Sequence, residues 1–242
     1  MRLDKFLVES GLGSRSQVKQ LLKKGQVWVN GTAVTSAKTQ IDERSDQIVV
    51  DGQTLLYEKF VYYLLNKPKG VISATEDDRH KTVLDLLDDT ARQKEVFPVG
   101  RLDVDTHGLL LLTNNGQLSH AMLSPKRHVA KVYQAQVAGL MDQVDVERFA
   151  QGIELKDFTC QPAQLDILER DEGAKTSLVR ITLSEGKFHQ VKRMVLACGK
   201  EVTDLQRLSM GSLLLEPSLE LGQWRRLTEE EMQSLEIFQV EL

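Results

Sequence analysis

Cysteine and histidine are scarce in this chain. Of its 242 residues, two are cysteines and five are histidines. Cys160 and Cys198 form no C-x-x-C pair and the histidines occur singly, so the sequence indicates neither a disulfide framework nor a zinc site. No apolar run reaches membrane length, and acids interrupt the opening MRLDKFLVESGL, where a signal peptide would be apolar. We therefore expect a cytoplasmic protein with no membrane attachment and no metal.

Positive charge is not in excess either. The chain has 31 Lys and Arg against 35 Asp and Glu, a net charge of −4. That balance argues against a general nucleic-acid coat protein, although a polyanion responds to a local patch rather than to the sum. One such patch is predicted on a helix that follows Ser14, where Arg15, Lys19 and Lys23 share a face and no acid intervenes before Gly25. It is either a solvated face or a polyanion-binding surface.

The first 52 residues combine two short helices with a small sheet. The basic helix is followed by VWVNGTAV, in which Asn30-Gly31 predicts a type I′ hairpin, and by the strand QIVVDG. The pattern RLDKFL, GxxSR, a basic helix and VxVNG resembles the S4 RNA-binding domain. The resemblance implies that residues 1–52 contact structured RNA. The residues assigned to this contact are Arg2, Lys5, Arg15, Lys19, Lys23 and Asn30.

The remainder of the chain predicts a second, larger domain. We expect residues 53–59 to be a linker and residues 60–242 to form the catalytic domain. Many short strands mixed with a few helices predict an α+β fold, with a mostly antiparallel mixed sheet flanked by helices. The stretch SEGKFHQVKRMVLACG is expected to be one helix from Ser184 to Gly199.

The stretch GRLDVDTHGLLLLTNN, residues 100–115, contains the main candidate catalytic residues of the second domain. Leu109–Thr113 predicts a buried strand, and Asp103 and Asp105 lie in the polar turn before it. The turn alone is consistent with a solvated loop. Glycoside hydrolysis requires a defined distance between two carboxyl groups, and two residues this close in a turn do not fix that distance. We therefore do not favour a glycosidase. A magnesium-dependent phosphatase would need a long apolar strand before Asp103 and a second acidic cluster, and neither is convincing.

A third interpretation uses Asp103 alone. We expect an ionised Asp103 in a cleft lined by basic residues, where it can act as nucleophile or base without metal or cofactor. Lys67 and Lys69 flank a proline that stiffens their loop, so both are expected to project into the cleft, although solubilising lysines in a turn are the simpler alternative. The expected lining cations are Lys67, Arg101, Lys192 and Arg193. Tyr133 could stack on an unstacked base, which suits an enzyme that acts on a flipped RNA nucleotide.

Four motifs carry a specific resemblance. KPKG, GRLDxDTxGLLLLTNNG, KVY and EGKFHQVKRM, in this order behind an S4-like segment, resemble the RsuA/RluB/RluE/RluF family of RNA pseudouridine synthases over almost the whole chain. The resemblance implies that Asp103 is the catalytic aspartate, Tyr133 stacks on the target uracil, and Lys192 pairs with Asp103, with Arg193 as the second candidate. Arg101 would fill the space left by the flipped uridine. His189 is assigned a structural, hydrogen-bonded role.

Within the family the chain is most similar to enzymes of small-subunit (16S) rRNA. The MRLDKF start, the HQVKRM spelling and the lack of a long basic tail indicate this branch. The resemblance implies isomerisation of one uridine in 16S rRNA without a cofactor. We expect the substrate to be a small-subunit assembly intermediate, and nothing in the sequence demands more than a monomer. A large-subunit (23S) rRNA synthase of the same family and a non-catalytic RNA-binding assembly factor stay open as alternatives.

Overall fold

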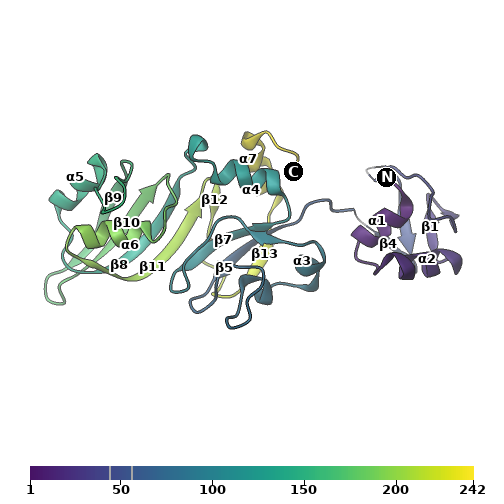
Figure 1. The fold of residues 1–242 in the computed structure, drawn as a ribbon, viewed down its shortest axis with the longest axis horizontal. Helices are drawn as coiled ribbons and strands as arrows, with labels where there is room; N and C mark the ends of the chain where they lie inside the picture. The colour runs from purple at the N-terminus through teal and green to yellow at the C-terminus, as the bar shows by residue number, and fades with distance from the viewer. Residues whose placement is uncertain (44, 56) are drawn as a thin grey trace. The chain divides into compact units, whose positions relative to one another are not determined.

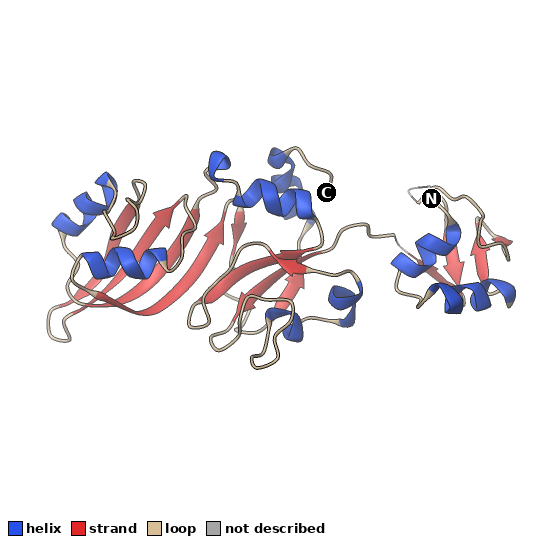
Figure 2. Cartoon of the chain, in the orientation of Figure 1, coloured by secondary structure: helices blue, strands red, loops and turns tan. Residues whose placement is uncertain are grey.

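Two units of chain make up the computed structural model, which describes residues 1–43, 45–55 and 57–242 (Figure 1). The first unit comprises Met1–Val61 together with Asp88–Glu95, and the second comprises Tyr62–Leu87 together with Val96–Leu242. Helices and strands are mixed in both (Figure 2). The expected α+β class is confirmed.

The first unit packs two helices against a four-stranded antiparallel sheet. Helix α1 spans Leu3–Glu9 and α2 spans Arg15–Lys23. The α2 helix begins where predicted, because the Ser14 side chain accepts a hydrogen bond from Gln17 N and the Gln17 side chain accepts one from Ser14 N. The sheet order is β2-β1-β3-β4, with β1 at Val27–Val29, β2 at Thr32–Ala33, β3 at Ile48–Val50 and β4 at Gln53–Leu55. Leu3, Phe6, Leu7, Val18 and Leu22 supply the helical side of its core.

Two left-handed dipeptides form the tight hairpins of this sheet. Asn30 and Gly31 have φ values of 49° and 77°, as the predicted hairpin requires, and Asp51 and Gly52 have φ values of 50° and 80°. The second hairpin folds β4 back onto β3. The expected linker at 53–59 is therefore wrong at its start, because Asp-Gly is itself a hairpin signal and the chain remains in the sheet to Leu55. Residue 56 of that range lies outside the described residues.

A short segment from within the expected catalytic domain groups with the first unit. It contains helix α3, Asp89–Gln93. Its Lys94 Nζ donates a hydrogen bond of 2.7 Å to the carbonyl of Glu58 and lies 5.7 Å from the ring centre of Tyr57. The expected single boundary at residue 60 is wrong for this segment, because these contacts join residues too far apart in sequence for a linear pattern to reveal.

A nine-stranded sheet forms the second unit. Seven strands follow the order β13-β5-β7-β11-β8-β10-β9, with β12 on β11 and β6 on β7. All pairings are antiparallel except β7 with β11. The strands are β5 (Tyr62–Lys67), β6 (Phe97–Pro98), β7 (His107–Thr113), β8 (Lys131–Ala138), β9 (Gln164–Asp171), β10 (Thr176–Leu183), β11 (Glu201–Met210), β12 (Leu213–Leu214) and β13 (Trp224–Arg226).

Helices cover this sheet and supply its cores. Helices α5 (Gln143–Gln151) and α6 (Gln190–Ala197) cover one face of β8, β10 and β11 (Figure 1), with Phe149 and Met194 in the core beneath them. The other helical segments are η1 (Val83–Leu86), α4 (Gly116–Leu123), η2 (Pro125–Arg127), α7 (Glu229–Leu235) and η3 (Glu236–Phe238). No helix among the described residues is both long and apolar enough to span a membrane. Cys160 and Cys198 are buried and unpaired, and burial raises the pKa of each thiol.

The parallel contact between β7 and β11 joins the two halves of the large sheet at one glycine. Only two residue pairs form it, Gln206 with His107 and Arg207 with Gly108. A Cβ at Gly108 would lie 2.3 Å from the Arg207 carbonyl oxygen, and the glycine has φ of 107°. No other residue type fits there. The approach lets Arg207 Nε donate to the Leu109 carbonyl at 2.7 Å.

The helix expected from Ser184 to Gly199 is wrong in its first third. Helix α6 begins at Gln190, because His189 adopts a left-handed conformation with φ of 48° and ψ of 31°. Residues 184–189 form a loop instead. That loop brings polar side chains to the end of the sheet where the β7 motif begins.

Candidate active site

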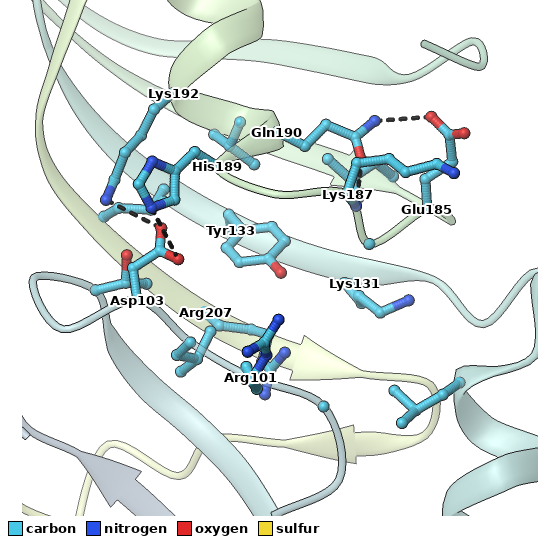
Figure 3. Close-up of a pocket in the computed structure, with 18 residues that line it drawn as sticks. Arg101, Asp103, Lys131, Tyr133, Glu185, Lys187, His189, Gln190, Lys192 and Arg207 are labelled. Carbon is cyan, nitrogen blue, oxygen red and sulfur yellow. Dashed lines mark hydrogen bonds and ion pairs between the residues drawn. The ribbon is translucent and has the colours of Figure 1, made fainter. Parts of the chain in front are cut away.

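A cavity of about 120 Å³ opens in the second unit above β8 and β11. Its walls are the loop before β7, the loop before α6 and the first turn of α6 (Figure 3). A cavity of about 150 Å³ can take up one benzene ring, so this one is on the scale of a single six-membered ring. Among the described residues, no group of three or more His, Cys, Asp or Glu is arranged to hold a metal ion.

Asp103 lies at one end of the cavity and contacts Lys192. The distance from Asp103 Oδ2 to Lys192 Nζ is 3.1 Å, and the same ammonium is 2.6 Å from Asp105 Oδ1. Burial acts to lower the pKa of Lys192, but its hydrogen bonds to Asp105 and Asp103 outweigh burial and raise it. The hydrogen bond from Lys192 lowers the pKa of Asp105. Lys192 is therefore a charged bridge between two carboxylates, as expected for Asp103.

The exposure of the two carboxylates separates their roles. The Asp103 side chain is 29% exposed and lines the cavity, whereas that of Asp105 is 66% exposed and does not. Only Asp103 can meet a molecule held in the cavity.

Hydrogen bonds from the Lys67 side chain hold the backbone on which Asp103 lies. The Lys67 ammonium donates to three carbonyl oxygens, those of Pro68 at 3.1 Å, Asp103 at 3.0 Å and Thr106 at 2.9 Å. Its side chain is fully buried, and burial lowers the pKa of Lys67 to about 8. Lys67 therefore does not line the cavity, contrary to expectation. As the last residue of β5, its side chain is directed into the protein and supports the loop.

Two further contacts from the same KPKG region fix the loop before β7. Gly70 N donates to the Val104 carbonyl at 2.7 Å. The Ser73 hydroxyl donates to the Leu102 carbonyl at 2.9 Å and accepts from Leu102 N at 3.0 Å. Three separate residues, Lys67 at the end of β5 and two after it, thus hold the backbone on both sides of Asp103.

Tyr133 forms the middle of the cavity wall, as expected for a stacking residue. It lies on β8, directly opposite Arg207 of β11 in the strand register. In Figure 3 its ring lies between the group of Asp103, His189 and Lys192 on one side and Lys131 on the other. Arg101 is exposed and also lines the cavity.

Two buried cations in the cavity were not predicted. Lys131 is 7% exposed and Arg207 is 2% exposed, and both line the cavity. Burial and, secondarily, the charge of Arg207 lower the pKa of Lys131 to about 8. The alternation of a strand places Lys131 on the same face as Tyr133, so the KVY motif contained this information. Nothing in the sequence around Arg207 distinguishes it from a surface arginine.

His189 is closer to Asp103 than its assigned structural role implies. Its Nε2 is 3.5 Å from Asp103 Oδ1, and its ring stacks on Phe188 with centroids 3.8 Å apart. A left-handed backbone is uncommon for a residue other than glycine and concentrates at functional sites. His189 therefore belongs to the site, where it contacts Asp103 Oδ1 while Lys192 contacts Asp103 Oδ2.

Two other predicted cleft residues lie elsewhere. Arg193 forms an ion pair with Asp157 and lies 5.1 Å from the ring centre of Phe158. It follows Lys192 by one residue on α6, and a helix turns by about 100° per residue, so the two side chains diverge. Lys69 pairs with Asp204. Neither Arg193 nor Lys69 lines the cavity.

The predicted RNA-binding residues of the first unit fall into two groups. Arg15, Lys19 and Lys23 are exposed on α2 and form no ion pair among the residues the structure describes. In contrast, Arg2 pairs with Asp4 at 2.6 Å and Lys5 with Glu9 at 3.6 Å. The basic face of α2 is therefore the main uncompensated positive surface of this predicted set.

Asn30 has a structural task in the hairpin. Its Nδ2 donates to Asp46 Oδ1 at 2.7 Å, and its Oδ1 accepts from Gln47 N at 2.8 Å. The assignment of Asn30 to RNA binding stays a prediction, and in the structure both ends of its amide hold the hairpin to the loop before β3.

Comparison with known proteins gives consistent matches along the chain. The profile of the RNA pseudouridylate synthase family matches residues 61–197, and that of the S4 domain matches residues 1–48. The chain is 44% identical to an uncharacterized RNA pseudouridine synthase, YtzG, of Bacillus subtilis, with 97% of this chain and 98% of the relative covered. It is 39% identical to ribosomal small subunit pseudouridine synthase A of Yersinia pestis, covering 97% and 98%. The identity to ribosomal large subunit pseudouridine synthase B of Bacillus subtilis is also 39%, covering 97% and 95%.

A solved structure shares the fold. The chain is 37% identical to the protein in a crystal structure of pseudouridylate synthase and superposes on it with a TM-score of 0.67, covering 97% of this chain and 99% of the other.

Replacing Lys67 by Met tests whether its ammonium holds the Asp103 loop. We expect a loss of roughly 2–4 kcal/mol in unfolding free energy, because three carbonyls lose a charged donor. The amides of Gly70 and Thr106 should exchange with deuterium at least about tenfold faster, corresponding to about 1.4 kcal/mol of local protection. Lys69→Met is the matched control two residues away and should cost less than about 1 kcal/mol. Equal effects of the two variants would contradict the assignment.

Proposed function

Because the chain belongs to the RNA pseudouridylate synthase family, we propose that it converts one uridine of small-subunit (16S) rRNA to pseudouridine. Asp103 is the proposed catalytic group. One observation carries the proposal. Asp103 lies at the end of a cavity of ring size, 3.1 Å from Lys192, with Tyr133 in the same wall. A carboxylate, a cation and an aromatic ring around such a space suit a nucleotide extruded from RNA.

The reaction is an isomerisation with a complete atomic balance. The bond between N1 of uracil and C1′ of ribose breaks, the base turns, and a bond forms between C5 and C1′. C5 loses a proton and N1 gains one. No oxidant, reductant or second substrate takes part, so we propose that no cofactor is required.

We propose a distinct role for each contact of the cavity. Asp103 directs its carboxylate to the sugar or base of the flipped uridine. Lys192 and His189 contact its two oxygens and hold the side chain in one orientation. Tyr133 stacks on the uracil, because an aromatic ring next to a single-ring space is the usual platform for an unstacked base. Arg101, at the exposed rim, occupies the position that the uridine leaves in the RNA.

We further propose that the substrate is ribosomal and that one chain is sufficient to act on it. Relatives named as small-subunit and as large-subunit enzymes are equally similar at 39% identity. The preference for 16S rRNA therefore rests on the MRLDKF and HQVKRM spellings.

The first unit, which matches the S4 domain, is proposed to dock on the rRNA. The exposed basic face of α2 is the proposed contact, because Arg15, Lys19 and Lys23 carry no compensating charge there. Such a surface binds phosphates without reading bases. Selection of the uridine is then left to the shape of the RNA and to the cavity.

Asp103→Asn tests the catalytic assignment. We expect turnover to fall at least about 10³-fold, because no other carboxylate lines the Asp103 end of the cavity. RNA affinity should change by less than about threefold, which is about 0.6 kcal/mol. Tritium release from 5-tritiated uridine in the RNA measures turnover, and filter binding measures affinity. Asp105→Asn is the matched control and should retain turnover within about tenfold, since Asp105 shares Lys192 but faces solvent. Near-normal turnover by Asp103→Asn would refute the assignment.

Removing the basic face of α2 tests the docking proposal. The triple variant Arg15→Ala, Lys19→Ala and Lys23→Ala should bind RNA more weakly. The slope of log affinity against log salt should become shallower by roughly 2–3, because each lost phosphate contact removes about 0.7–0.9. A control with the same charge change, Lys156→Ala, Arg170→Ala and Lys175→Ala in the second unit, should keep the slope. The proposal fails if the two triple variants behave alike.

Mapping pseudouridines in ribosomal RNA tests the substrate. Cells that lack this protein should lose one pseudouridine from 16S rRNA, and expression of the wild-type chain, but not of Asp103→Asn, should restore it. Loss of a 23S site instead would assign the protein to the large subunit. Loss of no site would refute ribosomal RNA as the substrate.

A further inference from the structure

Two buried cations in the cavity have no negative partner. Lys131 of β8 and Arg207 of β11 are 7% and 2% exposed, and no carboxylate within residues 1–43, 45–55 and 57–242 pairs with either. Lys131 Nζ donates to one group, the Val129 carbonyl at 3.0 Å. Arg207 Nε donates to the Leu109 carbonyl, but its Nη2 has no hydrogen-bond partner. A buried, unpaired guanidinium nitrogen is costly, so an oxygen supplied by a molecule in the cavity would stabilise this end of it.

Resting on the proposed function, we propose that Lys131 and Arg207 bind the carbonyl oxygens of the target uracil and stabilise the negative charge that the base carries once it is detached from the ribose. The two side chains place positive charge at the edge of the base. Asp103 acts on the nucleotide from the opposite end.

The position of the two cations favours the base over the phosphates. Lys131 and Tyr133 lie on one face of β8, and Arg207 is the register partner of Tyr133 on β11. A uracil stacked on Tyr133 therefore has both cations at its edge. The RNA backbone remains at the mouth of the cavity, where the exposed cations Arg101 and Lys187 lie.

Detachment of the base leaves negative charge on the uracil, which nearby cations can stabilise. When the N1–C1′ bond breaks, its electron pair remains on uracil N1 and spreads to O2 and O4. Cations placed where negative charge develops, in a site with little water, stabilise the detached state. An electron pair of the detached base then forms the C5–C1′ bond. C5 afterwards releases its proton and N1 takes one up. Lys131 and Arg207 exchange neither protons nor electrons with the base.

The mutual repulsion of the two cations supports this assignment. Burial and the nearby charge of Arg207 lower the pKa of Lys131 to about 8. A negative oxygen between the two groups would relieve both effects. A detached uracil held by two charge-assisted hydrogen bonds can turn in place without leaving the cavity.

Sulfur substitution in the target base provides the test. RNA carrying 2-thiouridine or 4-thiouridine at the target has a poor hydrogen-bond acceptor in place of O2 or O4. We expect at least one of the two substitutions to lower the kcat of the wild-type enzyme by about 10–100-fold. Lys131→Met should lower the kcat on uridine by about 10²–10³-fold with KM changed less than about threefold, and the sulfur substitution should then have no further effect. Lys131→Arg should restore part of both the kcat and the sulfur effect.

A control variant and a second chemical substitution distinguish binding of the base from binding of the RNA backbone. Lys187→Met removes a rim cation and should leave the full sulfur effect. Methylphosphonate at the phosphates flanking the target removes a backbone charge and should act equally on the wild type and on Lys131→Met. If the methylphosphonate effect disappears in Lys131→Met while the sulfur effect persists, the cations bind phosphate and the proposal is overturned.

The remaining outcomes separate this proposal from the proposed function. If the wild-type enzyme forms pseudouridine but is insensitive to both sulfur substitutions, the proposed binding of the uracil oxygens by Lys131 and Arg207 is overturned and the proposed function is not. This result is decisive even if the Lys131 variants fail to fold. Independent, multiplicative effects of Lys131→Met and sulfur also overturn the proposed binding. A wild-type protein that forms no pseudouridine in any rRNA overturns the proposed function and this inference together.

Discussion

One buried ammonium group holds the backbone that positions the Asp103 carboxylate. Lys67 is enclosed at the end of β5 and donates to three carbonyls, two of which belong to Asp103 and Thr106. Three donors on one flexible stem can satisfy three converging acceptors, which no uncharged side chain can do. Asp103 is thereby held through its backbone by one lysine and through its carboxylate by another, Lys192.

Charge is separated along the cavity in a way that matches the chemistry. At one end, the carboxylates of Asp103 and Asp105 share the single positive charge of Lys192, so negative charge is in excess there. At the other end, Lys131 and Arg207 have no acid among the described residues to offset them. Uridine isomerisation places an electron-poor sugar carbon and an electron-rich base side by side, and Figure 3 shows the Tyr133 ring between Asp103 and Lys131. Such an arrangement serves a reaction that separates charge within a single nucleotide. A protein that only bound RNA would have no use for it.

The sequence revealed those parts of the site that depend on local pattern. Asp103, the buried strand after it and the pairing with Lys192 follow from long motifs, and Tyr133 follows from an alternating strand. Lys67 and Arg193 were misplaced because the sequence does not reveal in which direction a basic side chain in a loop or on a helix points. Lys67 is directed inward by the end of β5, and Arg193 is turned away by one helical step. The contact of His189 with Asp103 was not predicted, because a helix was expected where the left-handed backbone of His189 ends a loop.

The least predictable features depend on contacts between distant segments. Arg207 is buried because Gly108 lets β7 approach β11 closely, and this requires knowledge of a parallel pairing between segments far apart in the chain. Asp88–Glu95 groups with the first unit through contacts that no linear pattern reveals. In contrast, the Asp51-Gly52 hairpin was readable from the sequence, and the expected linker at 53–59 overlooked it.

We propose that a flipped uridine occupies the cavity between Asp103 and the Lys131–Arg207 pair. A crystal structure of the Asp103→Asn protein bound to its target RNA would show where the uridine binds. We expect the target base outside the RNA stack, on the ring of Tyr133, with its sugar beside residue 103 and a carbonyl oxygen on Lys131 or Arg207. A target uridine that remains stacked in the RNA, or that binds outside this cavity, would contradict it.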